Sequence, residues 1–184
     1  MSNIIVRIAT ADDETFAKII TDEMEASAII RGSGISKRSP ESIVKKMKEG
    51  KGVIAITEDN VWVGFSYVEV WSNGEFVSNS GLIVSPAFRG GGIARLIKDK
   101  IFELSRTLYP QSKIFSITTG LAIMKMNASL GFETVTFNEL TKENEFWQGC
   151  KSCVNYAVLQ GKHCTNCLCT AMLFTPEAKE AVVV

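Results

Sequence analysis

The chain has 184 residues, which is long enough for one domain with a sizeable hydrophobic core. Hydrophobic residues make up 46% of it and charged residues 22%, as in an ordinary globular protein. Lysine and arginine together number 20, as do aspartate and glutamate, so the formal net charge is zero and gives no case for a nucleic-acid partner. No apolar run approaches the length that spans a bilayer, so no membrane partner is expected.

The N-terminal sequence MSNIIVRIATADDE lacks the basic start and the apolar core of a secretory signal peptide. We therefore expect a cytoplasmic location. In that compartment the five cysteines are expected to be reduced.

One strand and two helices are expected before residue 51. Residues 4–8 form the strand, and Thr10 with Asp13 makes a variant of the capping box that starts the first helix. The second helix starts at Ser39-Pro40, because proline suits the first turn of a helix, and it ends near Gly50.

The loop between these helices, residues 31–40, carries the basic residues Arg31, Lys37 and Arg38. We favour a solvated connection there, because charged loop residues are usually solvated. The alternative is a mobile substrate loop in which one of these cations meets a carboxylate.

Three strands are expected in succession, at residues 52–57, 61–71 and 75–84. Polar turns separate them, and Asn73-Gly74 supplies the positive φ angles of a tight hairpin. Antiparallel hairpins that lead into one crossover helix predict a mixed α/β sheet.

The stretch from Ser80 to Arg106 has the order strand, glycine turn, helix. The apolar run of residues 82–84 is typical of a buried strand, and Pro86 ends it. After the glycine turn, apolar residues from Ile93 onward recur at helical spacing. The first N–H groups of a helix have no internal partner, so this turn predicts an anion site, with a pyrophosphate as the natural ligand.

Two nucleotide-binding motifs do not fit this turn. The Walker pattern needs Gly-Lys followed by Ser or Thr, whereas Gly92 is followed by Ile93 and Ala94. The dinucleotide fingerprint needs spaced glycines near the start of a βαβ unit, whereas these glycines are contiguous and lie in the middle of the chain.

The spacing Arg89-x-x-Gly92-x-Ala94 resembles motif A of the GNAT acetyltransferases, whose loop holds the pyrophosphate of acetyl-coenzyme A (acetyl-CoA). The resemblance covers about residues 4–140. It implies a GNAT-type α/β fold with a mixed, mostly antiparallel central sheet of six or seven strands flanked by helices. It also implies an enzyme that transfers an acetyl group from acetyl-CoA to a primary amine.

The resemblance also implies where acetyl-CoA binds. The backbone of the fourth strand would hold its pantetheine arm, and the loop with the helix start would hold its pyrophosphate. In this family the fourth strand carries a bulge and splays from its neighbour, which fits the small and polar residues at 78–81. The alternative is an edge strand with a polar face. The assigned residues are Leu82, Ile83, Val84, Arg89, Gly90, Gly91, Gly92, Ile93 and Ala94.

A fifth strand at residues 113–118 follows the crossover helix and is therefore expected to be parallel to the fourth. A short helix at 121–130 ends at Gly131, a good C-cap, and a sixth strand spans 132–140. The ending Leu-Gly-Phe at 130–132 is a second match to the GNAT pattern.

The catalytic groups are harder to assign. Many GNAT enzymes have a tyrosine in the short helix that protonates the leaving thiolate, and Asn127 occupies that position here. Asparagine can donate a hydrogen bond but cannot act as the acid, so either it only orients the thiol or a water, or another group protonates the thiolate. Glu75 is our first candidate for the general base. Glu69 also lies on a central strand, and the alternative for Glu75 is a solvated charge beside a turn.

All five cysteines lie between residues 150 and 169. Two Cys-x-x-Cys pairs predict a structural zinc site, with Cys169 as an alternative to Cys167. The other hypotheses are free thiols packed in the core and a reduced thiol pair. The predicted zinc ligands are Cys150, Cys153, Cys164 and Cys167.

We divide the chain into a GNAT core at residues 1–140 and a Cys-rich extension at 141–184 that packs on it, with a last strand at about 168–174. The extension has no counterpart in the family pattern. It either closes over the active site or forms a contact in a homodimer.

Neutral charge and a basic loop favour a small acceptor amine that carries a carboxylate, such as an amino acid. A protein N-terminus or a lysine is the alternative acceptor. Two other functions stay open, namely a non-catalytic acyl-CoA sensor, which Asn127 favours, and a zinc-stabilised interaction module.

Overall fold

The structure, a computed structural model, describes residues 3–32 and 37–177. Its centre is a seven-stranded sheet with the strand order β1-β2-β3-β4-β5-β7-β6. Strands β4 and β5 pair in parallel, and the other neighbouring strands pair antiparallel, so the expected mixed, mostly antiparallel sheet is confirmed. The strands are β1 (Ile4–Ile8), β2 (Gly52–Thr57), β3 (Trp62–Trp71), β4 (Phe76–Val84), β5 (Lys113–Thr118), β6 (Glu133–Val135) and β7 (Thr170–Phe174).

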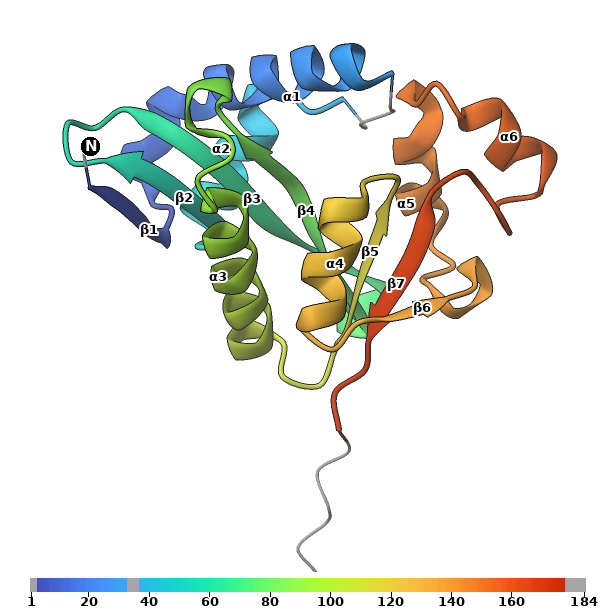
Figure 1. The fold of residues 1–184 in the computed structure, drawn as a ribbon. Coiled ribbons are helices and arrows are strands. Elements are labelled where there is room, and N and C mark those ends of the chain that lie inside the picture. The colour runs from blue at the N-terminus through green and yellow to red at the C-terminus, as the bar shows by residue number, and fades with distance from the viewer. Residues whose placement is uncertain (1–2, 33–36, 178–184) are drawn as a thin grey trace, which may run out of the picture.

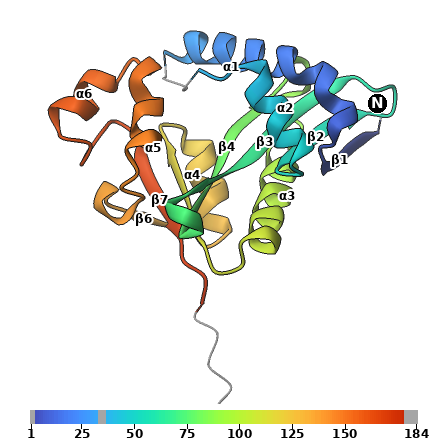
Figure 2. The same ribbon diagram turned by 180° about the vertical axis from the view of Figure 1, so that it is seen from behind.

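Helices cover both faces of this sheet. The first two helices lie on one face and the next two on the other, as the opposite views in Figures 1 and 2 show. The last two short helices lie beside β7, next to the C-terminal end of the first helix. The α-helices of the described residues are α1 (Ala17–Arg31), α2 (Pro40–Lys48), α3 (Ile93–Leu108), α4 (Leu121–Ser129), α5 (Asn144–Gln148) and α6 (Tyr156–Gly161).

Three apolar clusters hold these layers together. Ile97 and Ile101 of α3 pack against the sheet on one face, and Ile20 of α1 packs on the other. The third cluster lies between Phe115 of β5 and Trp147 of α5. Each cluster contains several fully buried side chains, each of which contributes about 1.5–3 kcal/mol by leaving water.

Most predicted bounds agree with the structure to within two residues, and the sixth strand is the exception. It ends at Val135, because Thr136 starts a 3-10 turn in which its N–H donates to the Glu139 carboxylate at 2.9 Å. The prediction of a strand through residue 140 is therefore wrong. The capping box at Thr10 and Asp13 is present, and Gly131 has the positive φ, +86°, expected at a helix end.

The residues after 140 contribute to the same sheet as those before it. Strand β7 lies between β5 and β6, so the GNAT-like sheet is completed by the segment that contains the cysteines. The division of the chain at residue 140 stays a prediction. In the part of the chain that the structure describes, no helix is long and apolar enough to cross a membrane.

Candidate active site

Strands β4 and β5 are paired only at one end. Residues 76–78 pair with residues 113–115, and beyond them β4 pairs with β3 alone while β5 pairs with β7. The two strands therefore separate toward the end of β4 that leads into the glycine loop (Figure 1). Ser85 N–H donates to Val63 O, so by antiparallel alternation the Val84 N–H points to the unpaired edge.

A bulge at Gly81 accompanies this separation. The register with β3 passes from Phe65 opposite Ile83 to Tyr67 opposite Ser80, which leaves one extra residue on β4. Gly81 has φ +65°, and a Cβ atom there would lie 2.7 Å from the Tyr67 ring and 2.9 Å from the Met24 methyl. Glycine is therefore required for both conformation and space. The bulge and splay expected at residues 78–81 are confirmed.

The glycine loop presents a row of backbone N–H groups. Gly90 and Gly92 have φ +84° and +80°, and α3 begins directly after them at Ile93. Among the described residues, the amides of residues 90–94 donate no hydrogen bond, and the helix ladder starts with Arg95 and Leu96, which donate to Gly92 O. Free amides at a helix N-terminus fit a pyrophosphate, as the sequence predicts.

Arg89 supports this loop through its side chain. Its Nε donates to Val84 O at 3.0 Å, and its Nη2 donates to Glu23 and to Ser27 of α1, both at 2.7 Å. The guanidinium is thus directed at α1 and the end of β4. These hydrogen bonds hold the loop in place, and the assignment of Arg89 to the pyrophosphate of acetyl-CoA stays a prediction.

A buried lysine lies on the α3 face of the splayed strand. Lys98 is 2% exposed, its Nζ donates to Asn79 Oδ1 at 3.2 Å, and the Phe132 ring lies 4.8 Å away. Burial lowers its pKa to about 7. Asn79 Nδ2 also donates to Ser105 Oγ at 2.7 Å, so two residues of α3, Lys98 and Ser105, hold the Asn79 amide in place.

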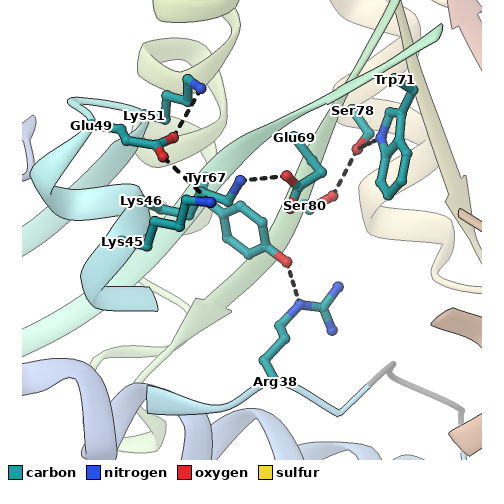
Figure 3. A network of polar contacts seen from close by, with 10 residues as sticks. All are labelled: Arg38, Lys45, Lys46, Glu49, Lys51, Tyr67, Glu69, Trp71, Ser78 and Ser80. Carbon is teal, nitrogen blue, oxygen red and sulfur yellow. Dashed lines mark hydrogen bonds and ion pairs between the residues drawn. The ribbon is translucent and has the colours of Figure 1, made fainter. Parts of the chain in front are cut away.

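A polar cluster occupies the opposite face, where β3 meets α2 and the loop before it (Figure 3). The Tyr67 hydroxyl accepts a hydrogen bond from Arg38 Nε, and Arg38 also lies over the Tyr67 ring. Glu69, two residues along β3, forms an ion pair with Lys46 of α2. Burial raises the pKa of the Tyr67 phenol.

Serines of β4 extend this cluster toward the splayed edge. Ser78 lies opposite Glu69 and Ser80 opposite Tyr67 in the ladder, and their hydroxyls are 2.9 Å apart. The Trp71 indole donates to Ser78 Oγ at 3.0 Å, as Figure 3 shows. A line of hydroxyl groups therefore runs along β4 beside the carboxylate of Glu69.

A cavity of about 530 Å³ lies between α1, residues 37–40 and the segment around residue 153. Its lining includes Arg38, which donates a hydrogen bond to the Tyr67 hydroxyl. Its lining also carries Lys18 and Lys37, each paired with an acid of α1, at 2.6 Å from Asp22 and 2.7 Å from Glu25. With three basic and two acidic side chains, the described lining has an excess of positive charge.

Glu75 does not lie near these groups. It precedes β4 at the paired end of the two strands, where Lys113 N–H donates to its carbonyl at 3.0 Å and the two side chains are 3.9 Å apart. Its side chain is 60% exposed. At about 3.3 Å per strand residue it is roughly 20 Å from Leu82. This placement agrees with the alternative, a solvated charge beside a turn, and the role of Glu75 as general base stays a prediction.

Asn127 is fully buried between α4 and β7. Its Nδ2 donates to the Met172 sulfur at 3.6 Å, and its Oδ1 has no partner among the described residues. With no exposed surface in this structure, it does not line the opening beside β4. Its role near the thiol of acetyl-CoA stays a prediction, and its burial argues against that role.

The five cysteines lie together beside β7, and none forms a disulfide. Burial raises the pKa of Cys150 to about 11 and that of Cys169 to about 12, so both thiols are protonated at neutral pH. Within residues 3–32 and 37–177, no three or more His, Cys, Asp or Glu side chains are arranged to hold a metal as they stand. Zinc binding by Cys150, Cys153, Cys164 and Cys167 stays a prediction.

Sequence reasoning missed Tyr67, Lys46 and Lys98. Tyr67 belongs to an alternating aromatic strand, where a tyrosine is ordinarily a core residue. Lys98 belongs to α3, and a lysine among the charged residues of an amphipathic helix is ordinarily exposed. The one available signal was the pairing of strands β3 and β4 through the Asn73-Gly74 turn, which brings residues 67 and 69 opposite residues 80 and 78.

Solved structures share this fold. N-acetylglutamate synthase from Neisseria gonorrhoeae, complexed with coenzyme A and N-acetyl-glutamate, matches 97% of this chain at 16% identity with a TM-score of 0.66. This chain spans only 36% of that enzyme. Rv2747 from Mycobacterium tuberculosis, in complex with CoA, matches 93% of this chain and 98% of its own, at 19% identity and a TM-score of 0.64.

A GNAT superfamily phosphinothricin acetyltransferase from Sinorhizobium meliloti, in complex with acetyl-CoA, matches 97% of this chain and 91% of its own. The identity is 16% and the TM-score 0.62. No family model matches the sequence, and no curated protein matches it. The chain thus has the fold of the GNAT acetyltransferases, at identities that show the fold alone.

Proposed function

We propose that this protein is an acetyl-CoA-dependent N-acetyltransferase whose acceptor is a small primary amine that carries a carboxylate, such as an amino acid. One observation carries the proposal. The unpaired edge of β4 runs from a row of free helix-terminal amides to a polar cluster, and the cluster contacts a cavity with an excess of positive charge.

The cofactor side supports acetyl-CoA as the acyl donor. The amides of residues 90–94 would bind the pyrophosphate, and the outward N–H of Val84 would bind the pantetheine arm. The three solved structures described above contain coenzyme A or acetyl-CoA.

The acceptor side supports a carboxylate-bearing amine. Arg38 lines the cavity beside Tyr67, and a guanidinium is well shaped for a carboxylate because it can donate two parallel hydrogen bonds. This favours the substrate-loop hypothesis for Arg38. N-acetyl-glutamate, present with the Neisseria enzyme, is an N-acetylated amino acid with carboxylates, which agrees with this class of acceptor.

The reaction requires two proton movements. The amine nitrogen attacks the thioester carbonyl, a C–N bond forms, the C–S bond breaks and the thiolate takes up a proton. The amine must lose a proton, and Glu69 is our candidate for the base, directly or through water, because it lies opposite Ser78 at the start of the opening. The remaining catalysis comes from positioning and from strand N–H groups that polarise the carbonyl.

The direct test is thiol release from acetyl-CoA against amino acids, their decarboxylated amines, polyamines and short peptides. We expect release with amino acids and little with the decarboxylated amines. Arg38→Gln should raise the KM for the amino acid by about 10- to 100-fold, the worth of a hydrogen bond between charged groups, and leave the affinity for acetyl-CoA unchanged. Lys37→Gln is the matched control, because Lys37 lines the same cavity but its side chain is 74% exposed.

A non-catalytic acyl-CoA sensor is the second candidate, and the burial of Asn127 favours it, because no acid is then evident near the leaving thiolate. Tight binding of acetyl-CoA without release for any acceptor would support the sensor. Release with peptides alone would shift the acceptor to a protein N-terminus or lysine. A cytoplasmic location remains a prediction from the sequence.

A further inference from the structure

The cysteines converge from two segments that are separated in the chain. Cys150 and Cys153 belong to one tight turn, in which Cys153 N–H donates to Cys150 O at 2.9 Å. Cys167 and Cys169 lie just before β7. Four thiols thus approach one another as two pairs, each pair supplied by a short segment.

A small void of about 20 Å³ lies where the two pairs meet, and Cys150, Cys153, Cys167 and Cys169 all line it. Cys164 is not among its lining residues. Leu168, which lies between Cys167 and Cys169, is 64% exposed, whereas both of these cysteines line the void. The structure therefore selects a set of four cysteines different from the two Cys-x-x-Cys pairs of the sequence.

Hydrogen bonds already link the two pairs through Asn155. Its N–H donates to Cys153 Sγ at 3.4 Å, and its carbonyl lies 4.0 Å from Cys167 Sγ. Backbone N–H groups that donate to sulfur are a common outer shell of thiolate metal sites, where they orient the ligands. Apolar side chains, among them Ile117, Trp147 and Leu159, also line the void, next to Asn155 and Tyr156.

We propose that Cys150, Cys153, Cys167 and Cys169 bind a zinc ion as four thiolates and that Cys164 is not a ligand. The thiols as they stand are not arranged to hold a metal, so binding requires the four sulfurs to move toward one another. On binding, each of the four thiols loses its proton to solvent and the ion takes a tetrahedral shell.

The site would also fix one wall of the acceptor cavity. Ser152 and Val154, the two neighbours of Cys153, line that cavity, and Ser152 Oγ accepts a hydrogen bond from Lys37 N–H at 3.0 Å. This second step rests on the proposed function, whereas zinc binding does not. Loss of zinc should therefore raise the KM for the acceptor and leave acetyl-CoA binding unchanged.

The first experiment uses the whole wild-type chain. It is purified without chelator, kept reduced and exposed to zinc, and its zinc content is measured together with alkylation of each cysteine by mass spectrometry. We expect one zinc per chain, with Cys164 alkylated and the other four cysteines protected until a chelator removes the metal. Cobalt in place of zinc should give the intense absorption of tetrahedral thiolate coordination.

A zinc-free chain after this treatment would overturn the proposal, as would protection that includes Cys164 in place of Cys169, or a disulfide between any of the four. Cys169→Ser should lose zinc, and the matched Cys164→Ser should keep it. Acetyl-CoA binding reports whether each variant is folded. If Cys169→Ser does not fold, the protection pattern of the wild-type chain still shows which four cysteines bind the zinc.

A wild-type chain that binds zinc but releases no thiol with any acceptor would contradict the proposed function and leave the zinc site intact.

Discussion

The two sides of the opening beside β4 are built differently. The proposed cofactor side uses backbone groups from one contiguous stretch, the unpaired edge of β4 and the loop that leads into α3. The proposed acceptor side uses side chains from segments far apart in the chain, including Arg38, Lys46, Tyr67 and the neighbours of Cys153. A backbone site depends on local conformation, whereas a side-chain site depends on how distant elements pack.

This difference predicts how each side responds to substitution. The cofactor side should be sensitive to changes that alter φ angles and tolerant of changes to side chains that point away. The acceptor side should respond to single side-chain changes that leave the backbone intact. The following predictions test this contrast.

The largest effect is expected from Glu69→Gln. Loss of a general base should lower kcat by about 100-fold or more at neutral pH, because positioned bases typically contribute 10²–10⁴-fold. Glu75→Gln is the matched control and should leave kcat unchanged, because Glu75 is exposed at the paired end of the strands. Steady-state kinetics of both variants provide the measurement, and an equal loss in both would rule out Glu69 as the base.

Gly92→Val should weaken acetyl-CoA binding by about 100-fold or more, through loss of about two charge-assisted hydrogen bonds at roughly 1.5–3 kcal/mol each. Gly50→Val is the control, because Gly50 also has a positive φ, +65°, with open space around it and lies at the end of α2. Both variants carry similar backbone strain, and calorimetric titration with acetyl-CoA compares them. Equal affinities would contradict the assignment of the glycine loop.

Lys98→Met should stabilise the protein at pH 6 by roughly 2–4 kcal/mol, because each pKa unit of difference corresponds to about 1.36 kcal/mol. The folded-state pKa of about 7 lies below the usual 10.5, so the unfolded chain binds more protons between these values. Wild-type stability should therefore rise with pH across that window, and the advantage of the variant should shrink toward pH 10.

Urea unfolding at pH 6, 8 and 10 measures this effect. Lys100→Met is the matched control on the same helix, because the Lys100 side chain is 43% exposed. A pH-independent gain for Lys98→Met would mean that Lys98 is not held neutral by burial.

The smallest effect is expected from Asn127→Leu, which should change kcat by less than about threefold, since a positioned catalytic group would cost far more. Its amide contacts Met172 in the core, and its Oδ1 has no partner among the described residues, so an apolar replacement should also keep the protein stable. A tenfold loss of kcat with an unchanged melting temperature would instead place Asn127 at the thiol.

Much of the fold was predictable from local sequence. The strands at residues 4–8, 52–57 and 113–118 have the expected bounds, and the glycine turn before α3 lies where the sequence predicts it. The bulge at Gly81 was also predictable, because a glycine in a strand interior has few other uses. The sixth strand was not, because the capping box at Thr136 competes with strand pairing.

The candidate site divides in the same way. The free amides of residues 90–94 follow from the order strand, glycine turn, helix, so the sequence by itself determined the loop that we propose for the cofactor. Other features are visible only in the tertiary structure. Glu75 is exposed and far from the opening, and Asn127 and Lys98 are buried. Arg38 contacts Tyr67. The tertiary structure also puts Cys169, in place of Cys164, beside the other three cysteines. The physical reason is that neighbouring residues set the local backbone geometry. Burial, pKa values and side-chain contacts depend on distant segments that meet only when the chain folds.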